Sequence, residues 1–304
     1  MSMRALWTLL LAWPALADAA AALATATIVD GSPTLIRASA KLALGEGTRL
    51  AAEDIVETGA ARHLRLEFAD GLVLDLGPAT SLQLQPRLAG DAARKAARVY
   101  LLRGAVKVSV PAKTAALPGL LLSSPAVDLQ TTKRGAVIAL HAAQADVFAE
   151  SGEATLAERR AGKALGALRL KEGEFFAITG SGAGEVSASP RTGFIQRLPK
   201  AFLDTLPARA ALFRDKEPAS TPAGALVYAD VQPWIDAEPA LRGGFVTRWR
   251  ALARQGEFRK GLEQGLAAHP EWDRVLHPEL YLPKPASAPP GLPPPAGRPG
   301  TTRY

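Results

Sequence analysis

The chain of 304 residues contains no cysteine, two methionines and four histidines. The absence of cysteine excludes disulfides, thiolate metal ligands and a cysteine nucleophile, and it fits an exported domain that is large enough to fold without disulfides. A strong excess of one charge is also lacking, since 36 Lys and Arg against 29 Asp and Glu give a net charge of +7. Because the basic residues are scattered, we expect no nucleic-acid partner.

Long apolar runs are missing as well, and a bilayer span needs about 20 such residues. The first residues, MSMRALWTLLLAWPALADAA, combine the positive charge of Arg4 with a short apolar run and the small-residue motif Ala15-Leu16-Ala17. This layout is typical of a secretory signal peptide, which we assign to residues 1–17. We therefore expect a periplasmic or otherwise exported protein, with no transmembrane span after signal cleavage.

Glycine turns divide residues 26–190 into many short runs of alternating apolar and polar residues. In LEFADGLVLDLGPATSLQL, Asp70-Gly71 separates two such runs, and an Asp-Gly pair in this position predicts a hairpin because glycine adopts positive φ without penalty. Similar turns are expected at Arg103-Gly104 and Arg134-Gly135. The pattern predicts a mainly β protein whose all-β domain of many short strands is either a sandwich or a short solenoid.

The remainder of the chain has a different composition. Prolines interrupt short helical patterns in residues 191–230, which we interpret as a linker with helical turns. Helical periodicity, broken at Gly256, predicts a small α-helical hairpin in residues 231–282. Residues 283–304 are proline-rich and are expected to be disordered.

Four aromatic residues in the helical hairpin are candidates for an interaction surface. They either dock the hairpin onto the β domain or form a surface for a partner. These residues are Phe245, Trp249, Phe258 and Trp272.

The sequence contains no clear catalytic, cofactor-binding or metal site. No serine has the G-x-S-x-G context of a nucleophile elbow, and GSGAGE at 180–185 lacks the lysine and helix of a nucleotide loop. The two His-Pro-Glu segments at His269 and His277 could be read as metal ligands, but proline followed by glutamate is an ordinary helix start. We therefore assign no metal, no cofactor and no catalytic residue.

Paired carboxylates are the alternative source of chemistry, because glycoside hydrolysis uses two of them. Five acidic residues near turns and strand ends are candidates: Glu53, Asp54, Glu57, Asp70 and Asp75. The alternation of Leu72, Leu74 and Leu76 predicts that Asp75 points outward, as an ordinary solvated residue.

The order of the turns carries a family resemblance. The elements follow one another as Glu53-Asp54-Ile55, Thr58-Gly59, Phe68-Ala69-Asp70-Gly71 and Leu101-Leu102-Arg103-Gly104. In this order they resemble the FecR-like periplasmic domain, and the resemblance covers roughly the first half of the mature chain. At Gly135 the sequence reads KRGA, where the family more often has a Gly-Thr pair. The resemblance implies structural turn positions at Asp54, Thr58, Gly59, Asp70, Gly71, Gly104 and Gly135.

The resemblance also implies a function, namely a non-catalytic envelope module that binds or scaffolds an envelope protein or a cell-wall glycan in signalling or assembly. In the signalling members, a cytoplasmic anti-sigma segment and a membrane helix precede this domain. Neither part precedes it in this sequence, so we expect a soluble exported relative. The alternative is an enzyme that acts on envelope polysaccharide or peptidoglycan through the turn and strand carboxylates.

Overall fold

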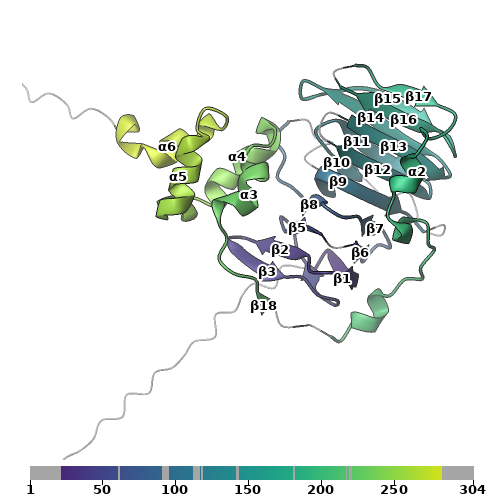
Figure 1. Cartoon of the computed structure of the whole chain (residues 1–304), viewed down its shortest axis with the longest axis horizontal. Helices are drawn as coiled ribbons and strands as arrows, with labels where there is room; N and C mark the ends of the chain where they lie inside the picture. Colours follow the sequence, from purple (N-terminus) through teal and green to yellow (C-terminus); the bar gives the residue numbers. More distant parts are fainter. Residues whose placement is uncertain are drawn as a thin grey trace, which may run out of the picture.

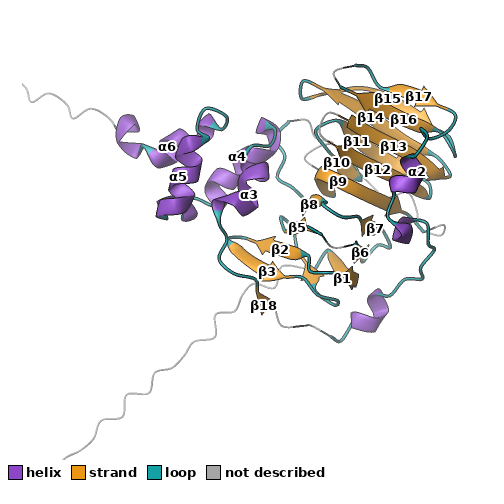
Figure 2. Cartoon of the chain, viewed as in Figure 1, coloured by secondary structure: helices purple, strands orange, loops and turns teal. Residues whose placement is uncertain are grey.

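Eighteen strands, counted among the residues that the computed structural model describes, join into one hydrogen-bonded network with two packed layers. The described residues are 22–60, 62–90, 96–111, 117, 119–141, 144–180, 182–216, 218 and 221–282. The strand β9 (Val99–Ser109) pairs with strands of both layers and therefore connects them. Its pairing with β10 (Leu122–Ser123) is parallel, whereas the other pairings are antiparallel. Figure 1 and Figure 2 show the strands between two groups of helices.

The two layers are defined by their strands. Layer A contains, in spatial order, β4 (Arg49–Leu50), β1 (Ala24–Asp30), β6 (His63–Phe68), β7 (Val73–Leu76), the second half of β9, β12 (Gly135–His141), β13 (Gln144–Ser151), β16 (Phe175–Thr179) and β17 (Glu185–Ser187). Layer B contains β18 (Thr221–Pro222), β3 (Ala40–Ala43), β2 (Thr34–Arg37), β5 (Ile55–Glu57), β8 (Ser81–Leu84), the first half of β9, β10, β11 (Val127–Thr132), β14 (Ala154–Arg160) and β15 (Lys163–Leu170).

The main hydrophobic core lies between the two layers. Successive side chains of a strand point to opposite faces, so every second residue of each strand enters this core. Layer A contributes Leu66, Leu74 and Val108, and layer B contributes Leu82 and Leu101, all nearly inaccessible to solvent. Burial of a side chain of this size stabilises the fold by about 1.5–3 kcal/mol, which makes the core the principal source of stability.

The outer face of layer A is covered by residues 191–213, which we call the strap. It contains α2 (Phe194–Arg197) and two 3₁₀ turns, Lys200–Phe202 and Ala210–Phe213. Phe194 of the strap packs edge-to-face on Phe175 of β16, with ring centroids 4.9 Å apart. A second apolar cluster therefore lies outside layer A.

The C-terminal helices cover the part of layer B's outer face that β2, β5 and β9 form. They are α3 (Tyr228–Ile235), α4 (Pro239–Arg248), α5 (Gly256–Gln264) and α6 (Asp273–Leu276), with 3₁₀ turns at Leu252–Arg254, Pro270–Trp272 and Pro278–Tyr281. Their apolar side chains share one buried cluster with Ile36, Ile55 and Tyr100 of layer B. The helices are thus packed on the β layers, at the left in Figure 1, whereas α2 lies on the opposite side.

These observations confirm a mainly β class with a small C-terminal helical segment, and the two packed layers correspond to the sandwich alternative. The predicted turn at Arg103-Gly104 is wrong, because β9 runs through these residues as one strand while it passes from layer B to layer A. The signal peptide assigned to residues 1–17 and the proline-rich tail at 283–304 lie outside the described residues. In the described part of the chain, no helix is both long enough and apolar enough to cross a membrane.

Candidate functional site

The turn residues of the β domain act on neighbouring backbone. The buried carboxylate of Asp54 accepts hydrogen bonds from the Arg37 guanidinium, the shorter of them 2.6 Å from Nη2 to Oδ2, and from the amide of Ala51 at 2.8 Å. The Thr58 hydroxyl donates to the carbonyl of Gly77 and accepts from the amide of Thr80, each at 2.8 Å. Both side chains therefore fix the loops between strands.

Asp70 and Gly71 form the turn between β6 and β7. Gly71 has a φ of 89°, in the left-handed region that favours glycine, and the Asp70 carboxylate accepts the amide of Leu72 at 3.3 Å. Asp70 also forms an ion pair with Arg98, 2.5 Å from Nη1 to Oδ2. Burial raises the pKa of Asp70, but the hydrogen bond and charge of Arg98 outweigh it, so the pKa lies below its ordinary value. Asp70 is therefore an ionised residue of a structural turn, and its charge is paired with that of Arg98.

The three remaining glycines differ in backbone conformation and in the space around them. Gly59 has a φ of 54° at the end of β5, and Gly104 has a φ of 95° within β9. A Cβ on Gly104 would lie 2.4 Å from the Cα of Thr80, so close approach of two backbones requires glycine there. Gly135 opens β12, and a Cβ would lie 2.9 Å from the Ser151 hydroxyl oxygen.

Asp75 is buried, contrary to the expected outward position. Its side chain lies on the outer face of layer A, where the strap excludes solvent, and it is 1 % exposed. His63 Nε2 and Arg65 Nε each lie 2.8 Å from Asp75 Oδ1. Burial raises the pKa of Asp75, yet the hydrogen bonds from His63 and Arg65 and the charge of Arg65 lower it further than burial raises it. Asp75 thus belongs to a buried ionic cluster, and the expectation that it is a solvated residue is wrong.

This ionic cluster holds the strap against layer A. Arg65 Nη1 donates to the carbonyl of Leu206 at 3.1 Å, and Lys107 Nζ donates to the carbonyl of Phe202 at 2.5 Å. The Glu67 carboxylate accepts the backbone amide of Arg209 at 2.9 Å, at the start of the 3₁₀ turn Ala210–Phe213. Side chains of layer A therefore supply hydrogen-bond partners for backbone groups of the strap. Without these partners, the backbone groups would lose their hydration on burial and gain nothing in return.

The four aromatic residues proposed as a partner surface lie inside the protein. Phe245, Trp249, Phe258 and Trp272 are each at most 3 % exposed and belong to the cluster between helices and layer B. In this structure they dock the helices, which was the other expected role, and they present no surface to a partner.

Polar groups complete this attachment of the helices. The guanidinium of Arg248 donates to three backbone carbonyls, those of Ile36, Ala38 and Glu53, at 2.6–3.0 Å. The indole of Trp234 donates to Glu57 Oε1 at 2.6 Å. Burial raises the pKa of Glu57, although hydrogen bonds from Ser81 and Trp234 oppose the shift. Glu57 is thus engaged between the layers and the helices.

Sequence reasoning missed these contacts, although cross-strand register carried part of the signal. Arg65 of β6 lies opposite Asp75 of β7, which lies opposite Lys107 of β9. Alternating charges on one face of three adjacent strands indicate an ion-paired face. No sequence signal identified the carbonyls that Arg248 binds.

The histidines of the two His-Pro-Glu segments bind separate carboxylates. His269 Nδ1 lies 3.1 Å from Asp236 Oδ1, and His277 Nδ1 lies 2.8 Å from Asp273 Oδ1. Each histidine precedes a proline that opens a 3₁₀ turn. Across the described ranges, no group of three or more His, Asp or Glu side chains is arranged to hold a metal ion.

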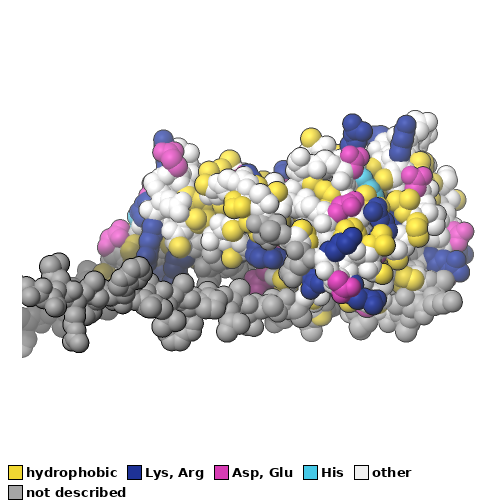
Figure 3. All heavy atoms as spheres, turned by 90° about the horizontal axis from the view of Figure 1, so that it is seen from below, with side chains coloured by type: hydrophobic (Ala, Val, Ile, Leu, Met, Phe, Trp, Pro, Cys, Tyr) yellow, Lys and Arg dark blue, Asp and Glu magenta, His cyan; other side chains and the backbone are white. Residues whose placement is uncertain are grey.

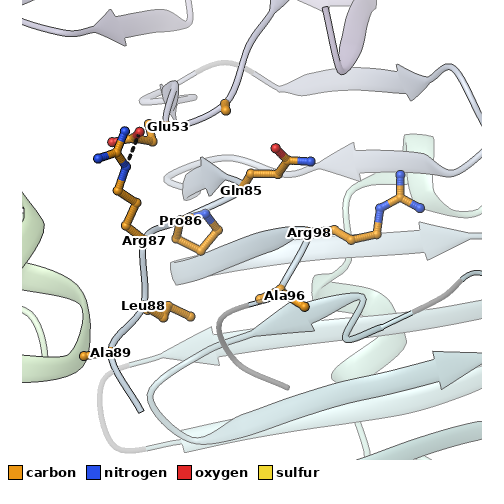
Figure 4. Close-up of a pocket in the computed structure, with 10 residues that line it drawn as sticks. Glu53, Gln85, Pro86, Arg87, Leu88, Ala89, Ala96 and Arg98 are labelled. Carbon is orange, nitrogen blue, oxygen red and sulfur yellow. Dashed lines mark hydrogen bonds and ion pairs between the residues drawn. The ribbon is translucent and has the colours of Figure 1, made fainter. Parts of the chain in front are cut away.

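An open groove of about 690 Å³ lies where the β layers meet α4 (Figure 4). Its lining combines charged side chains with apolar ones, and it comprises Ala52, Glu53, Gln85, Pro86, Arg87, Leu88, Ala89, Ala96, Ala97 and Arg98. Glu53 and Arg87 form an exposed ion pair of 2.6 Å at the rim. The face drawn in Figure 3 likewise mixes basic, acidic and hydrophobic side chains, with no extended patch of one kind.

One protein-family model matches a part of the β domain. Residues 54–155 match the family model described as FecR protein. Over these residues the chain is similar to FecR proteins. The matched segment lies within the predicted β domain of residues 26–190, and it includes six of the strands of layer B, β5, β8, β9, β10, β11 and the start of β14. The strap and the C-terminal helices lie beyond the FecR match.

The similarity to solved structures is low, and it extends over less than half of this chain. Two crystal structures described as "a putative anti-sigma factor from Parabacteroides distasonis" are similar to this chain, each with 14 % identity and a TM-score of 0.33. Each alignment covers 44 % of this chain and 57 % of the solved chain, so the chain spans little more than half of that protein. Among curated proteins, no significant match is found.

Proposed function

We propose that this protein is a non-catalytic binding or scaffold module of the cell envelope, which contacts an envelope protein or glycan in signalling or assembly. The observation that carries the proposal is the FecR match of residues 54–155, because this family resemblance implies regulatory contact with another molecule. The leader-like first residues support export.

The geometry of the acids supports binding over hydrolysis. Asp54, Asp70 and Asp75 are each ion-paired with an arginine, and Glu57 receives the indole of Trp234. A glycoside hydrolase needs two carboxyl groups that face a common substrate. Four of the five acids proposed for that role instead hold loops, the strap and the helices, and the fifth, Glu53, is ion-paired with Arg87 at the groove. The enzymatic alternative therefore gains no support.

The strap covers part of the outer face of layer A, and the helices cover layer B at β2, β5 and β9, so these parts of the surface are closed to a partner. The groove around Arg87 and the edge strand β15 are exposed, and both belong to the β domain. We therefore place the contact region at one or both of these features.

Site-specific photocrosslinking in the native envelope tests this proposal. A photoreactive amino acid is introduced at Arg87 in the groove, at Leu165 on β15, and at Leu212 of the strap as an exposed control. We expect a discrete adduct with an envelope protein or glycan from Arg87 or Leu165, and none from Leu212. If no position gives an adduct above the control, the protein is not a binding module of this kind.

A further inference from the structure

A pocket of about 220 Å³ lies between the outer face of layer A and the strap. β9, β12 and β13 contribute one side of its lining, and α2 with the residues that follow it contributes another. Figure 1 shows α2 beside β12 and β13. Drug-sized ligands occupy pockets of roughly 300–1,000 Å³, so a pocket of this volume suits a smaller molecule.

Small side chains on adjacent strands leave this space under the strap. Ala105 of β9 lies opposite Ala139 of β12, and Ala139 lies opposite Asp146 of β13. On its other side, Asp146 lies opposite Ala177 of β16. The three ladders are regular at these pairs, so the four side chains share one face of layer A. The row therefore combines three alanines with a single acid.

The carboxylate of Asp146 is buried in this row without a partner. Its neighbours along β13, Ala145 and Val147, lie in the core between the layers, so Asp146 points outward beneath the strap. Asp146 lines the pocket and is 4 % exposed, and its Oδ1 atom is enclosed with no hydrogen-bond donor. Because burying an unpaired carboxylate is costly, buried polar groups in proteins usually have a partner. The partner of Asp146 has to come from outside the described chain.

Basic side chains stand at the rim of the same pocket. Arg197 of α2 and His141 at the end of β12 line the pocket and are exposed. Among the described residues, neither side chain has a hydrogen-bond or ion-pair partner. Their charges and that of Arg191 act on the Asp146 carboxyl, but burial raises its pKa further than these charges lower it. The pocket thus combines a buried carboxylate, apolar walls such as Phe194, and an exposed guanidinium and imidazole.

We propose that this pocket binds an α-amino acid with a short apolar side chain, a function independent of the envelope contact proposed above. The ammonium group of the ligand donates to the Asp146 carboxylate, and its carboxylate accepts from Arg197 and His141 at the rim. Its apolar side chain packs on Phe194 and Leu198.

The charges of the pocket disfavour simpler ligands. A ligand with only a positive charge meets Arg197 at the rim, and a ligand with only a negative charge meets the carboxylate of Asp146. A metal ion also gains no support, since the described residues contain no group of three His, Asp or Glu side chains that could hold one. A zwitterion pairs with both kinds of charge at once.

Titration of the whole exported chain at pH 7, followed by amide NMR shifts, tests the inference with L-valine as the probe. Two matched probes each lack one charge: L-valinamide has no carboxylate, and N-acetyl-L-valine has no ammonium group. We expect L-valine to shift amides of β12, β13 and α2. Each matched probe should bind at least about tenfold more weakly, because it leaves a charged group of the pocket without its partner.

Variants of the pocket separate ligand binding from a structural role. Asp146→Asn keeps the size of the side chain and removes its charge, so L-valine should bind at least about tenfold more weakly. The urea midpoint of Asp146→Asn should be no lower than that of the wild type, because the carboxylate has no partner in the free protein. Arg197→Gln should weaken the binding of L-valine but not that of L-valinamide, which lacks the group that Arg197 binds. The matched control is Glu185→Gln, since Glu185 lies opposite Ala177 but is exposed and outside the pocket.

Several results would overturn the inference. They are the absence of L-valine binding, equal binding of the three probes, shifts away from the pocket, and wild-type affinity in Asp146→Asn. Stronger binding of L-valinamide than of L-valine would also overturn it, because the pocket would then take a cation. If Asp146→Asn does not fold, the comparison of the two probes on Arg197→Gln decides: equal losses for both contradict the inference.

Discussion

Replacing Gly104 by alanine is expected to destabilise the β layers strongly, because two independent costs fall on one methyl group. The φ of Gly104 is 95°, which an L-residue rarely adopts, and β9 changes layers at this residue. The new Cβ would lie 2.4 Å from both Cα and Oγ1 of Thr80. Thr80 is fully buried, and its hydroxyl accepts the amide of Ala105 at 3.1 Å, so it has little freedom to move.

The magnitude follows from separating these two costs. The positive φ costs about 1–2 kcal/mol for an L-residue. Insertion of a methyl group into packed surroundings costs about a further 1–3 kcal/mol. The free energy of unfolding should therefore fall by about 2–5 kcal/mol in Gly104→Ala.

Two glycines supply matched controls. Gly59 has a φ of 54° but no atom within 4 Å of an added Cβ, so Gly59→Ala should show the conformational cost alone. Gly166 has neither a positive φ nor a close neighbour, and Gly166→Ala should change stability by less than about 1 kcal/mol. Urea unfolding followed by far-ultraviolet circular dichroism measures the free energy of unfolding of all three variants. Equal losses in Gly104→Ala and Gly59→Ala would refute the steric part of the reasoning.

Two further predictions concern the groups that hold the strap and the helices. Arg248→Ala leaves three backbone carbonyls without their donor and should cost about 2–4 kcal/mol, whereas the exposed Arg250→Ala should cost almost nothing. Tryptophan fluorescence measures this loss at the helices, because every tryptophan of the described residues lies there. Asp75, whose pKa is lower folded than unfolded, contributes stability above about pH 4 that is lost as the pH falls through its folded pKa. The unfolding free energy of Asp75→Asn should therefore depend less on pH between about 5 and 3, and an unchanged dependence would contradict the assignment.

The β class could be predicted from the sequence because strands and tight turns leave their pattern in residues that are close together in the chain. Alternation and glycine turns depend on neighbouring residues, and the Asp70-Gly71 turn needs nothing beyond the flexibility of glycine and a short-range hydrogen bond. The resemblance to FecR rested on the order of such turns and agrees with the match of residues 54–155.

Other expectations failed where distant segments decide the outcome. Alternation placed Asp75 outside the core, which is correct for layer A itself, but the strap lies more than 100 residues later in the chain and buries that face. Gly104 was interpreted as a turn because glycine often ends strands, whereas here it permits close contact between two backbones. The aromatic pattern of the helices left docking and partner binding open, since periodicity cannot say what an apolar helix face meets.

The strap and the helices cover parts of the two outer faces, whereas the edge strand β15 is exposed along residues 163–167. A β sandwich buries one face of each layer, and a partner would ordinarily find two outer faces. Here buried ionic side chains attach the strap to one face, and Arg248 with the aromatic residues attaches the helices to the other. Backbone edges cannot be covered in this way without adding strands, and the short strands at three of the four edges offer little to pair with. Among the described strands, β15 is therefore a long edge strand that pairs with β14 alone, through a register with one bulge, and leaves backbone groups on its other side.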